Sequence, residues 1–301
     1  MRQRYCLEFF LASILILGLN HSADATEDRF KDVVIEKTRI TNELYMLQGR
    51  GGNIALLGGP DGVVMVDDQF AALSKRLLEA SRSIFKEDIR FVINTHHHGD
   101  HTGGNEFFGA RGSTILSHVN VRGHLLERLK SSDISHRFSL PILTFEDTIS
   151  LHVNKTTIRI KHLASAHTDG DAIVWFQPHD AVHLGDIYFN GKYPYIDVDA
   201  GGEVEGLIAA IKLILSQIGA STTIIPGHGA LSNRDELQEY LYMLETIRNR
   251  ALIHISSKSK DPSEPSLTRD FDAKWDGGFI SSKRFQEIVL RSLRNRHDKM
   301  F

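Results

Sequence analysis

The sequence predicts a layered α/β protein in which two sheets are covered by helices. Short apolar runs bounded by glycine and proline alternate with longer segments of helical period, first in one half of the chain and again in the other. Side chains that can hold metals recur directly after the apolar runs. Layered α/β folds place such residues at strand ends, because strands are rigid and the loops that follow them can vary.

The first half of the chain predicts a short strand meander followed by alternating helices and strands. Residues 58–62, Gly-Gly-Pro-Asp-Gly, are a turn signal, since glycine permits positive φ and proline presets the bend. Residues 71–85 place their leucines and an isoleucine on one side of a helix. The expected elements are strands at 44–48, 53–57 and 63–66, the helix at 71–85, a strand at 91–94, a helix starting within 104–108, a strand at 114–116 and a helix at 119–129.

The second half predicts a run of short strands and then long helices. A polar stretch at 256–266 contains two prolines and is typical of a linker or an exposed loop. The expected elements are strands at 143–145, 149–153, 157–163, 172–176 and 181–184, a helix at 203–218, a strand at 222–225, a helix at 235–255 and a last helix at 279–293.

Bulk composition indicates a globular protein without an electrostatic footprint for nucleic acid. The 301 residues are 41% hydrophobic and 24% charged, and the formal net charge is −3. A nucleic-acid-binding domain would carry an excess of lysine and arginine, so we expect a small-molecule substrate and no nucleic-acid partner.

The N-terminus is typical of a secretory signal peptide covering residues 1–25. Arg2 and Arg4 precede the apolar residues 9–19, and Ala23 and Ala25 fit the small-residue cleavage pattern. Eleven apolar residues are too few to span a bilayer, so we expect a periplasmic or secreted protein with no stable membrane insertion after cleavage. The remaining chain divides into a domain at 26–256 and, at 257–301, a linker with a helical extension that packs on the same domain.

Removal of the signal also removes the only cysteine, Cys6. The mature chain then has no disulfide and no thiol ligand. Any metal site in it must use nitrogen and oxygen donors.

The run Thr95-His96-His97-His98-Gly99-Asp100-His101 is the strongest functional signal. It directly follows an apolar strand-like stretch, and imidazole and carboxylate are ligands of zinc, manganese and iron. Alternation around a turn can direct His96 and His98 at one ion. Asp100 and His101, one step further along, can reach a second ion.

Three more apolar segments end in a residue of the ligand type. His167 follows 160–166, Asp186 follows 181–185, and His228 follows 223–227. A single histidine or aspartate after a strand is ordinarily a cap or turn residue. Four such strand ends with nitrogen or oxygen donors instead predict one shared metal site.

These motifs resemble the metallo-β-lactamase-fold superfamily of metal-dependent hydrolases, over roughly residues 37–255. The resemblance implies a four-layer αββα sandwich with a dinuclear site at one edge of the sheets. It also implies two Zn²⁺ ions, with iron or manganese possible in the same ligands. The first ion would be held by His96, His98 and His167, the second by Asp100, His101 and His228, and Asp186 would bridge both.

Asp186 departs from the best-known lactamase subclass, which has a cysteine at this place. The aspartate and the His101 ligand look more like the glyoxalase II, lactonase and RNase Z branches. The short tail does not match the glutathione-binding region of glyoxalase II. The sequence segments at 166–171 and 275–279 are similar to segments found in exported bacterial hydrolases of the superfamily.

The resemblance implies an exported dinuclear zinc hydrolase. A hydroxide shared by two ions about 3.5–4 Å apart would cleave an acyl C–N or C–O bond of a β-lactam, lactone or other ester. Asp100 would be a ligand and the catalytic residue that orients the nucleophile and accepts its proton.

Other residues are assigned from their positions. Tyr188, Lys192 and Tyr193 follow Asp186 and are expected to contact the substrate, although aromatic residues there also suit loop packing. Candidates to orient the ligand imidazoles, or to cap turns, are Thr95, Asp169 and Asp171. His97 and His183 are expected not to be ligands.

Two other functions stay open from the sequence. Some relatives with the same ligand string hold a single iron and oxidise persulfides, so a mononuclear iron oxidoreductase is one alternative. The other is a non-catalytic binding protein of the cell envelope with the same fold. Metal content separates the first alternative from the zinc hydrolase.

Overall fold

The computed structural model describes residues 29–130, 138–257 and 266–299. Residues 33–301 form one compact unit, and the unit at 1–32 is described only by a turn at 29–32. The expected signal peptide at 1–25 lies outside the described residues. Within the described part, no helix combines the length and apolar character that a membrane crossing requires.

The first sheet of the larger unit is mixed and, in the described residues, has seven strands in chain order. Its first four strands are antiparallel neighbours, and β4 to β7 run parallel. The strands are β1 (Glu36–Arg39), β2 (Leu44–Gln48), β3 (Ile54–Leu57), β4 (Val63–Val66), β5 (Ile89–Asn94), β6 (Thr114–His118) and β7 (Leu143–Phe145).

The second sheet has the strand order β12-β11-β10-β9-β8. Only the β11–β12 pair is parallel, and the other pairs are antiparallel. The strands are β8 (Thr148–Val153), β9 (Thr156–His162), β10 (Ala172–Gln177), β11 (Ala181–His183) and β12 (Thr223–Ile225).

An apolar core lies between the two sheets. Strand β9 alternates buried and partly exposed residues, so that Ile158 and Ile160 face this core, as period-two alternation requires. They meet Val64 and Ile93 from the first sheet and Val174 from the second. Apolar burial on both inner faces therefore joins the sheets into a sandwich.

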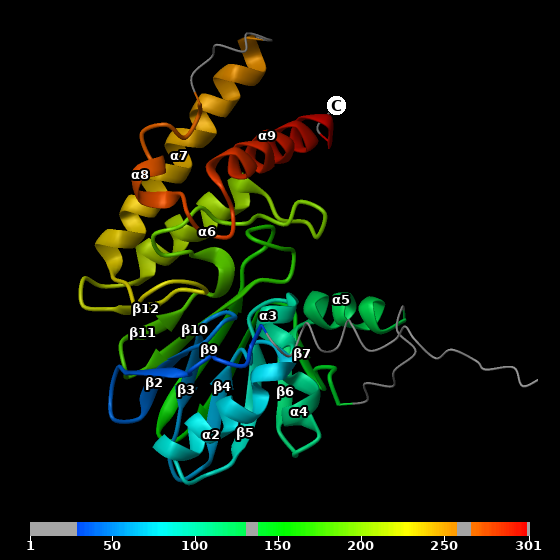
Figure 1. The fold of residues 1–301 in the computed structure, drawn as a ribbon, viewed down its shortest axis with the longest axis vertical. Coiled ribbons are helices and arrows are strands. Elements are labelled where there is room, and N and C mark those ends of the chain that lie inside the picture. Colours follow the sequence, from blue (N-terminus) through cyan, green and yellow to red (C-terminus); the bar gives the residue numbers. More distant parts are fainter. Residues whose placement is uncertain (1–28, 131–137, 258–265, 300–301) are drawn as a thin grey trace, which may run out of the picture. The chain divides into compact units, whose positions relative to one another are not determined.

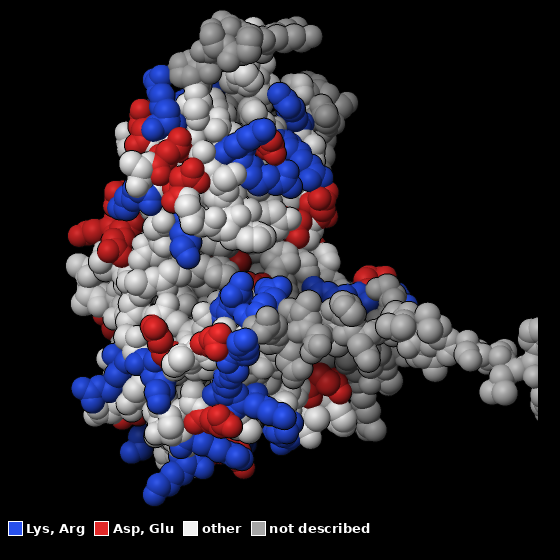
Figure 2. Space-filling model, viewed as in Figure 1, with Lys and Arg blue, Asp and Glu red and all other residues white. Residues whose placement is uncertain are grey.

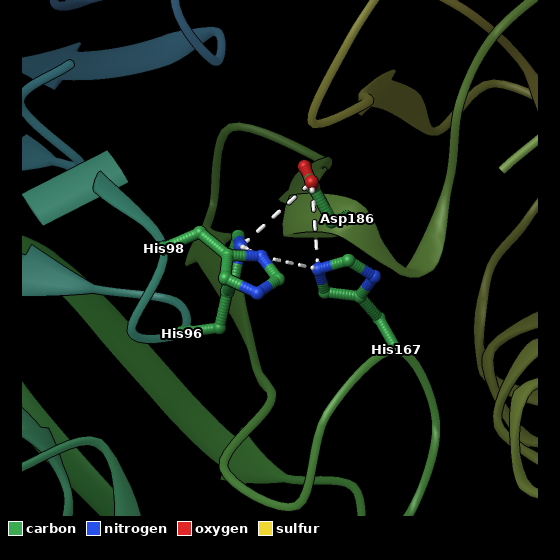
Figure 3. Close-up of side chains that lie close together, drawn as sticks. All are labelled: His96, His98, His167 and Asp186. Atoms are coloured by element: carbon green, nitrogen blue, oxygen red, sulfur yellow. Dashed lines mark hydrogen bonds and ion pairs between the residues drawn. The ribbon is translucent and has the colours of Figure 1, made fainter. Parts of the chain in front are cut away.

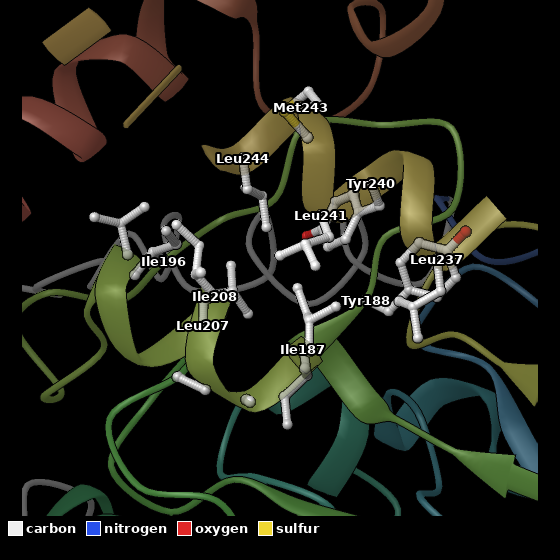
Figure 4. Close-up of a cluster of buried hydrophobic side chains, with 14 of the residues drawn as sticks. Ile187, Tyr188, Ile196, Leu207, Ile208, Leu237, Tyr240, Leu241, Met243 and Leu244 are labelled. Carbon is white, nitrogen blue, oxygen red and sulfur yellow. The ribbon is translucent and has the colours of Figure 1, made fainter. Parts of the chain in front are cut away.

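A second apolar core joins the outer face of the second sheet to helices α6 (Val204–Gln217), α7 (Arg234–Ser257) and α9 (Ser282–Lys299). Figure 4 shows side chains of α6 and α7 interleaved with Ile187 and Tyr188, which follow β11. The C-terminal helix packs on the same domain through buried Phe285 and Val289.

The other outer layer covers the first sheet. It consists of η1 (Ala71–Leu73), α2 (Ser74–Ile84), α3 (Gly99–Thr102), α4 (Asn105–Gly109) and α5 (Val119–Lys130) (Figure 1). In α2, Ser74, Leu77 and Ser81 recur at helical spacing and are buried. Helices, two sheets and helices give the expected four-layer αββα sandwich, so the predicted fold class is confirmed.

Four elements differ from the sequence prediction. Strand β1 was not expected because its residues are largely exposed and lack apolar alternation, and pairing with β2 defines it. The one-turn helix α3 forms inside the histidine run, and α8 (Asp272–Trp275) precedes the last helix. The last helix begins at Ser282 and not at residue 279.

Basic side chains gather on the visible face around α2 (Figure 2). Lys75 and Arg82 belong to α2, Lys86 lies in the loop that follows it, and Arg90 is the second residue of β5. All four are exposed. The histidine run follows the opposite end of β5, so Arg82, Lys86 and Arg90 lie away from the ligand-type residues.

Candidate functional site

The ligand-type residues meet at the edge where several strands of both sheets end. The histidine run follows β5 and continues into α3, and His167 lies in the loop after β9. Asp186 lies in η2 (Gly185–Ile187) after β11, and His228 follows β12. Strands β5, β11 and β12 end at this edge, so residues far apart in the sequence come together there.

The first cluster contains His96, His98, His167 and Asp186, whose side chains point toward one another in Figure 3. His98 Nδ1 lies 3.1 Å from His96 Nε2 and 2.9 Å from His167 Nε2. Asp186 Oδ2 lies 3.7 Å from His96 Nε2 and 3.6 Å from His167 Nε2. One point can therefore be reached by three imidazole nitrogens and one carboxylate oxygen.

The second cluster contains Asp100, His101 and His228. His228 Nε2 lies 3.4 Å from Asp100 Oδ2, and His101 Nε2 lies 3.7 Å from the same oxygen. Asp186 Oδ1 lies 3.1 Å from His101 Nε2 and 3.4 Å from His228 Nε2. The two oxygens of Asp186 are thus divided between the clusters, which is the arrangement of a bridging carboxylate.

The donor set fits two metal ions. Around an ion with metal–nitrogen distances near 2.0–2.1 Å, tetrahedral donors lie about 3.3 Å apart. The first-cluster separations of 2.9–3.7 Å span this value. Asp186 Oδ1 and His101 Nε2 are buried and have no hydrogen-bond partner among the residues that the structure describes. Buried polar atoms require partners, and coordination to an ion would satisfy both.

Hydrogen bonds select the metal-facing nitrogen of the first two histidines. His96 Nδ1 lies 3.1 Å from Thr95 Oγ1, and that hydroxyl donates to Asp67 Oδ2, so His96 Nδ1 carries the proton and donates. His98 Nε2 donates to Asp197 Oδ2 over 2.9 Å. The lone pairs of His96 Nε2 and His98 Nδ1 are then directed into the cluster.

The same logic applies to His167 and His101. His167 Nδ1 donates to the backbone oxygen of Tyr195 over 2.8 Å. His101 Nδ1 donates to Asp67 Oδ2 over 2.7 Å. Each ring therefore presents Nε2 to its cluster, and the partner atoms fix both the tautomer and the ring orientation.

Charge differs between the two clusters. Burial lowers the pKa of His167 to about 4 and holds the pKa of His96 well below its usual value, assisted by neighbouring His101. Burial opposes charge on His228 and His101 too, but Asp186 and the neighbouring carboxylates outweigh it. They raise the pKa of His228 to about 9 and hold the pKa of His101 well above its usual value. His96 and His167 of the first cluster are thus neutral at pH 7.

Two glycines let the backbone approach the ligands closely. A Cβ atom on Gly52 would lie 2.1 Å from Cε1 of His101, and one on Gly227 would lie 2.1 Å from Oδ1 of Asp186. The backbone N–H of Gly52 donates to the backbone oxygen of Asp100 over 3.0 Å. Side chains at either glycine would displace a ligand.

The structure corrects two of the expected substrate contacts. Tyr188 is fully buried, and its hydroxyl bonds to Asn190 and Ser232. Tyr193 is also buried; it stacks on Phe285 and donates to Asp272. Both are core residues, because the loop after η2 turns them toward the helices.

Lys192 is the exposed residue among the three expected substrate contacts. Its stem lies beside Gly278, where a Cβ atom would be 3.1 Å from Cβ of Lys192. It stands one residue before the loop enters the core at Tyr193. Its expected role in binding substrate stays a prediction.

The residues expected to orient ligands separate into different roles. Thr95 contacts His96 directly. Asp171 accepts hydrogen bonds from the backbone N–H groups of His167 and Thr168, so it holds the loop and not the imidazole. Asp169 pairs with His124, over 2.8 Å.

Of the two histidines expected not to be ligands, His183 bonds to the backbone of Asn53 and Gly185. It lies outside both of the clusters described above. His97 stacks on His124 and, with His98 and Asp197, lies in a third group of potential donors. His98 Nδ1 faces the first cluster and its Nε2 faces Asp197, so this third group supports the first cluster.

Thr95 was expected to orient a ligand, but sequence reasoning missed three other groups that do so. Asp67 bonds to Thr95 and His101, Asp197 bonds to His98, and the Tyr195 backbone bonds to His167. Asp67 directly follows β4, so the strand-end rule that found the other residues could have found it. Asp197 lies in an irregular segment and gave no comparable signal.

Comparison with known proteins agrees with this geometry. Residues 47–239 match the profile of the Metallo-beta-lactamase superfamily. A type 2 metallo-beta-lactamase of Bacillus cereus is 22% identical over 194 residues, covering 64% of this chain and 73% of that protein. A hydroxyacylglutathione hydrolase of a Polaromonas species is 30% identical over 149 residues, covering 48% of this chain and 50% of that protein.

A solved structure shares the fold. The metallo-beta-lactamase from Pontibacter korlensis superposes with a TM-score of 0.62 at 16% sequence identity, covering 70% of this chain and 99% of that chain. The family profile spans most of the two sheets and all of the donor residues in both clusters. This chain belongs to the metallo-beta-lactamase superfamily.

Proposed function

We propose that this protein is a dinuclear zinc hydrolase that cleaves an acyl C–N or C–O bond of a small molecule. One observation carries the proposal: the two oxygens of Asp186 face different donor clusters, at 3.6–3.7 Å from His167 and His96 and at 3.1–3.4 Å from His101 and His228. A carboxylate placed in this way suits two neighbouring ions, and the nitrogen and oxygen donors suit zinc.

Two divalent ions in these clusters would supply Lewis acidity for a substrate carbonyl and would lower the pKa of a water molecule between them. Asp100 is the residue that we assign to proton transfer. Burial disfavours its charge, but His101 and a bond from His228 lower the pKa of its carboxyl below the usual value. Its side chain is 25% exposed, so the carboxylate can orient a water molecule and accept its proton.

We also propose the substrate class from the relatives and the donor set. The relatives are a metallo-beta-lactamase and a hydroxyacylglutathione hydrolase. A β-lactam, a lactone or another ester would present the carbonyl that this chemistry requires. Lys192, exposed in the loop after Asp186, is the proposed contact for an anionic group on the substrate.

We further propose that the protein acts in the periplasm or outside the cell. This rests on the sequence of residues 1–25. Expression of the full chain in a bacterium, followed by mass spectrometry of the product, should give a mature N-terminus at Thr26. Retention of residues 1–25 in the purified protein would contradict export.

The test of the main proposal combines metal content with turnover. The purified protein is subjected to elemental analysis and incubated with a chromogenic cephalosporin, lactones, esters and thioesters. We expect close to two zinc ions per chain and hydrolysis of at least one acyl substrate. One iron per chain with oxygen-dependent oxidation of a persulfide would overturn the proposal, and so would a chain that binds no metal.

A matched pair of variants tests whether hydrolysis depends on the Asp186 carboxylate. Asp186→Ser should reduce the metal content below two ions and abolish hydrolysis, because it removes one donor from each cluster. Asp88→Ser removes an exposed carboxylate at the other end of β5 and should change neither quantity.

A further inference from the structure

Helix α5 presents three polar side chains toward the donor clusters. Asn120, His124 and Arg128 are spaced four residues apart, so they lie along one face of the helix. The family resemblance assigns no role to any of them. Their partners belong to the two segments that carry the histidines of the first cluster.

Two contacts join this face to the segment with His167. Asn120 Nδ2 donates to the backbone oxygen of Asp169 over 2.9 Å. His124 Nε2 lies 2.8 Å from Asp169 Oδ1. Asp169 stands two residues after His167, so both contacts restrain the loop that positions this imidazole.

Two further contacts join the same face to the histidine run. The His124 ring stacks on the His97 ring, with centroids 4.2 Å apart and an interplanar angle of 22°. Arg128 Nη2 donates to the backbone oxygen of His97 over 2.8 Å. His97 stands between His96 and His98, so its backbone position determines where both neighbouring side chains can point.

We propose that Asn120, His124 and Arg128 are positioning residues that hold the first-cluster histidines in register. This inference rests on the proposed metal site. His96 and His98 come from the loop after β5, while His167 comes from the loop after β9, in the other sheet. The α5 face contacts both loops, and His124 contacts both by itself.

The contacts are suited to local positioning more than to global stability. The His124 and Asp169 side chains are 31% and 38% exposed. Pairs with this exposure add little to the free energy of unfolding. The second cluster has separate supports: Asp67 holds His101, and the Phe189 ring stacks on His228 with centroids 4.9 Å apart. Loss of the α5 contacts should therefore weaken Zn²⁺ binding at the first cluster and leave binding at the second unchanged.

The test measures metal affinity in the full chain by competition with a chromophoric chelator. His228→Ala removes a donor of the second cluster and serves as the background in which the first cluster is measured alone. In that background, His124→Leu should weaken binding of Zn²⁺ by about 10-fold, the lower end of the range for residues that orient metal ligands. The melting temperature of the metal-free protein should stay within about 2 °C of its parent.

Conservative and control variants sharpen the test. His124→Gln keeps a donor for Asp169 and should recover part of the Zn²⁺ affinity. Arg128→Lys should lower the Zn²⁺ affinity less than Arg128→Met does. Glu127→Gln changes an exposed α5 side chain that pairs with Lys130, and should leave the affinity unchanged.

Each outcome is decisive. If the parent chain binds no Zn²⁺, the proposed metal site itself fails. If the wild-type chain binds two ions, but His124→Leu does not weaken Zn²⁺ binding in the His228→Ala background, the positioning role is wrong. A fall in melting temperature that accompanies the affinity loss, without recovery in His124→Gln, would indicate ordinary structural packing and overturn the proposal.

Discussion

At the scale of single residues, Asp67 connects the two halves of the histidine run. Its Oδ1 accepts from the Thr95 backbone N–H, and its Oδ2 accepts from the Thr95 hydroxyl and from His101 Nδ1. Its φ of 63° lies in the left-handed region, a strained conformation for an aspartate. Three accepted bonds by one buried carboxylate offset that strain.

Asp67→Asn should weaken zinc binding by about 10- to 100-fold, as the loss of such supports does elsewhere. An amide has one acceptor oxygen, so the acceptor is lost either for the Thr95 backbone N–H or for both the Thr95 hydroxyl and His101. Equilibrium dialysis against zinc buffers measures the effect. Asp88→Asn is the control, because Asp88 is an exposed carboxylate just before β5. Equal affinities in the two variants would contradict the role.

Asp100→Asn separates metal binding from proton transfer. The amide keeps one oxygen near His228, so most of the metal should remain, but an amide cannot accept a proton from water. We expect the kcat of the acyl substrate to fall by about 10²- to 10⁴-fold. Elemental analysis and steady-state kinetics are measured on the same preparation. Wild-type rates at full zinc content would refute the assignment.

At the scale of elements, the loop between β2 and β3 packs directly on His101, a proposed metal ligand. Gly52→Ala would place a Cβ atom 2.1 Å from the His101 ring. The ring must move, so we expect loss of one of the two zinc ions, measured by elemental analysis. Gly123→Ala is the matched control, because a Cβ atom there meets nothing within 4 Å. The control should keep both ions.

The two sheets are also joined by a histidine pair. His118 at the end of β6 and His162 at the end of β9 stack with centroids 3.7 Å apart. Burial, and then the neighbouring His162, lower the pKa of His118 to about 4. The unfolded state therefore binds a proton more readily than the folded state between about pH 4 and 6.5.

The pair predicts an acid-sensitive contribution to stability. The free energy of unfolding is not reduced by His118 above about pH 6.5, where the imidazole is neutral in both states. It falls as the pH drops toward 4, because the unfolded state takes up a proton that His118 cannot accept in the fold. His118→Phe keeps a stacked ring that cannot titrate. Between pH 7.5 and 4.5, wild type should lose about 1–2 kcal/mol more unfolding free energy than this variant. Urea titrations at both pH values measure it, and parallel losses would exclude the effect.

At the scale of the whole molecule, the C-terminal segment is part of the core. Residues after 239 lie beyond the match to the family profile, yet Trp275, Phe285 and Val289 are buried with residues of α6 and α7. Phe285 also stacks on Tyr193, which follows Asp186 by seven residues. The segment therefore supports the loop after Asp186 as well as the outer helices.

Phe285→Ala should lower the free energy of unfolding by about 3–5 kcal/mol, because it opens a cavity in a fully buried position. Phe279→Ala removes the same side chain where it is 93% exposed and should change stability by about 0.5 kcal/mol or less. Denaturant unfolding of both variants gives the comparison. Similar values for the two would show that the segment does not contribute to the core.

The sequence predicted strands and helices wherever apolar period and turn chemistry agree. Residues 44–48 and 63–66 were located in this way, and they form β2 and β4 with those bounds. It could not predict β1, whose residues are exposed and are held by hydrogen bonds to β2. It also left Tyr188 and Tyr193 between substrate contact and loop packing, since a sequence does not show which way a loop turns its side chains.

By itself, the sequence predicted which residues would carry the chemistry: imidazole and carboxylate donors in a fixed pattern after apolar strands. Only the tertiary structure decided how they are used. The division of the Asp186 oxygens between two clusters, the choice of ring nitrogen in His96 and His98, and the contacts of α5 all depend on atoms brought together from distant segments. Residue type is encoded locally, whereas distance and hydrogen-bond partner are properties of the packed chain.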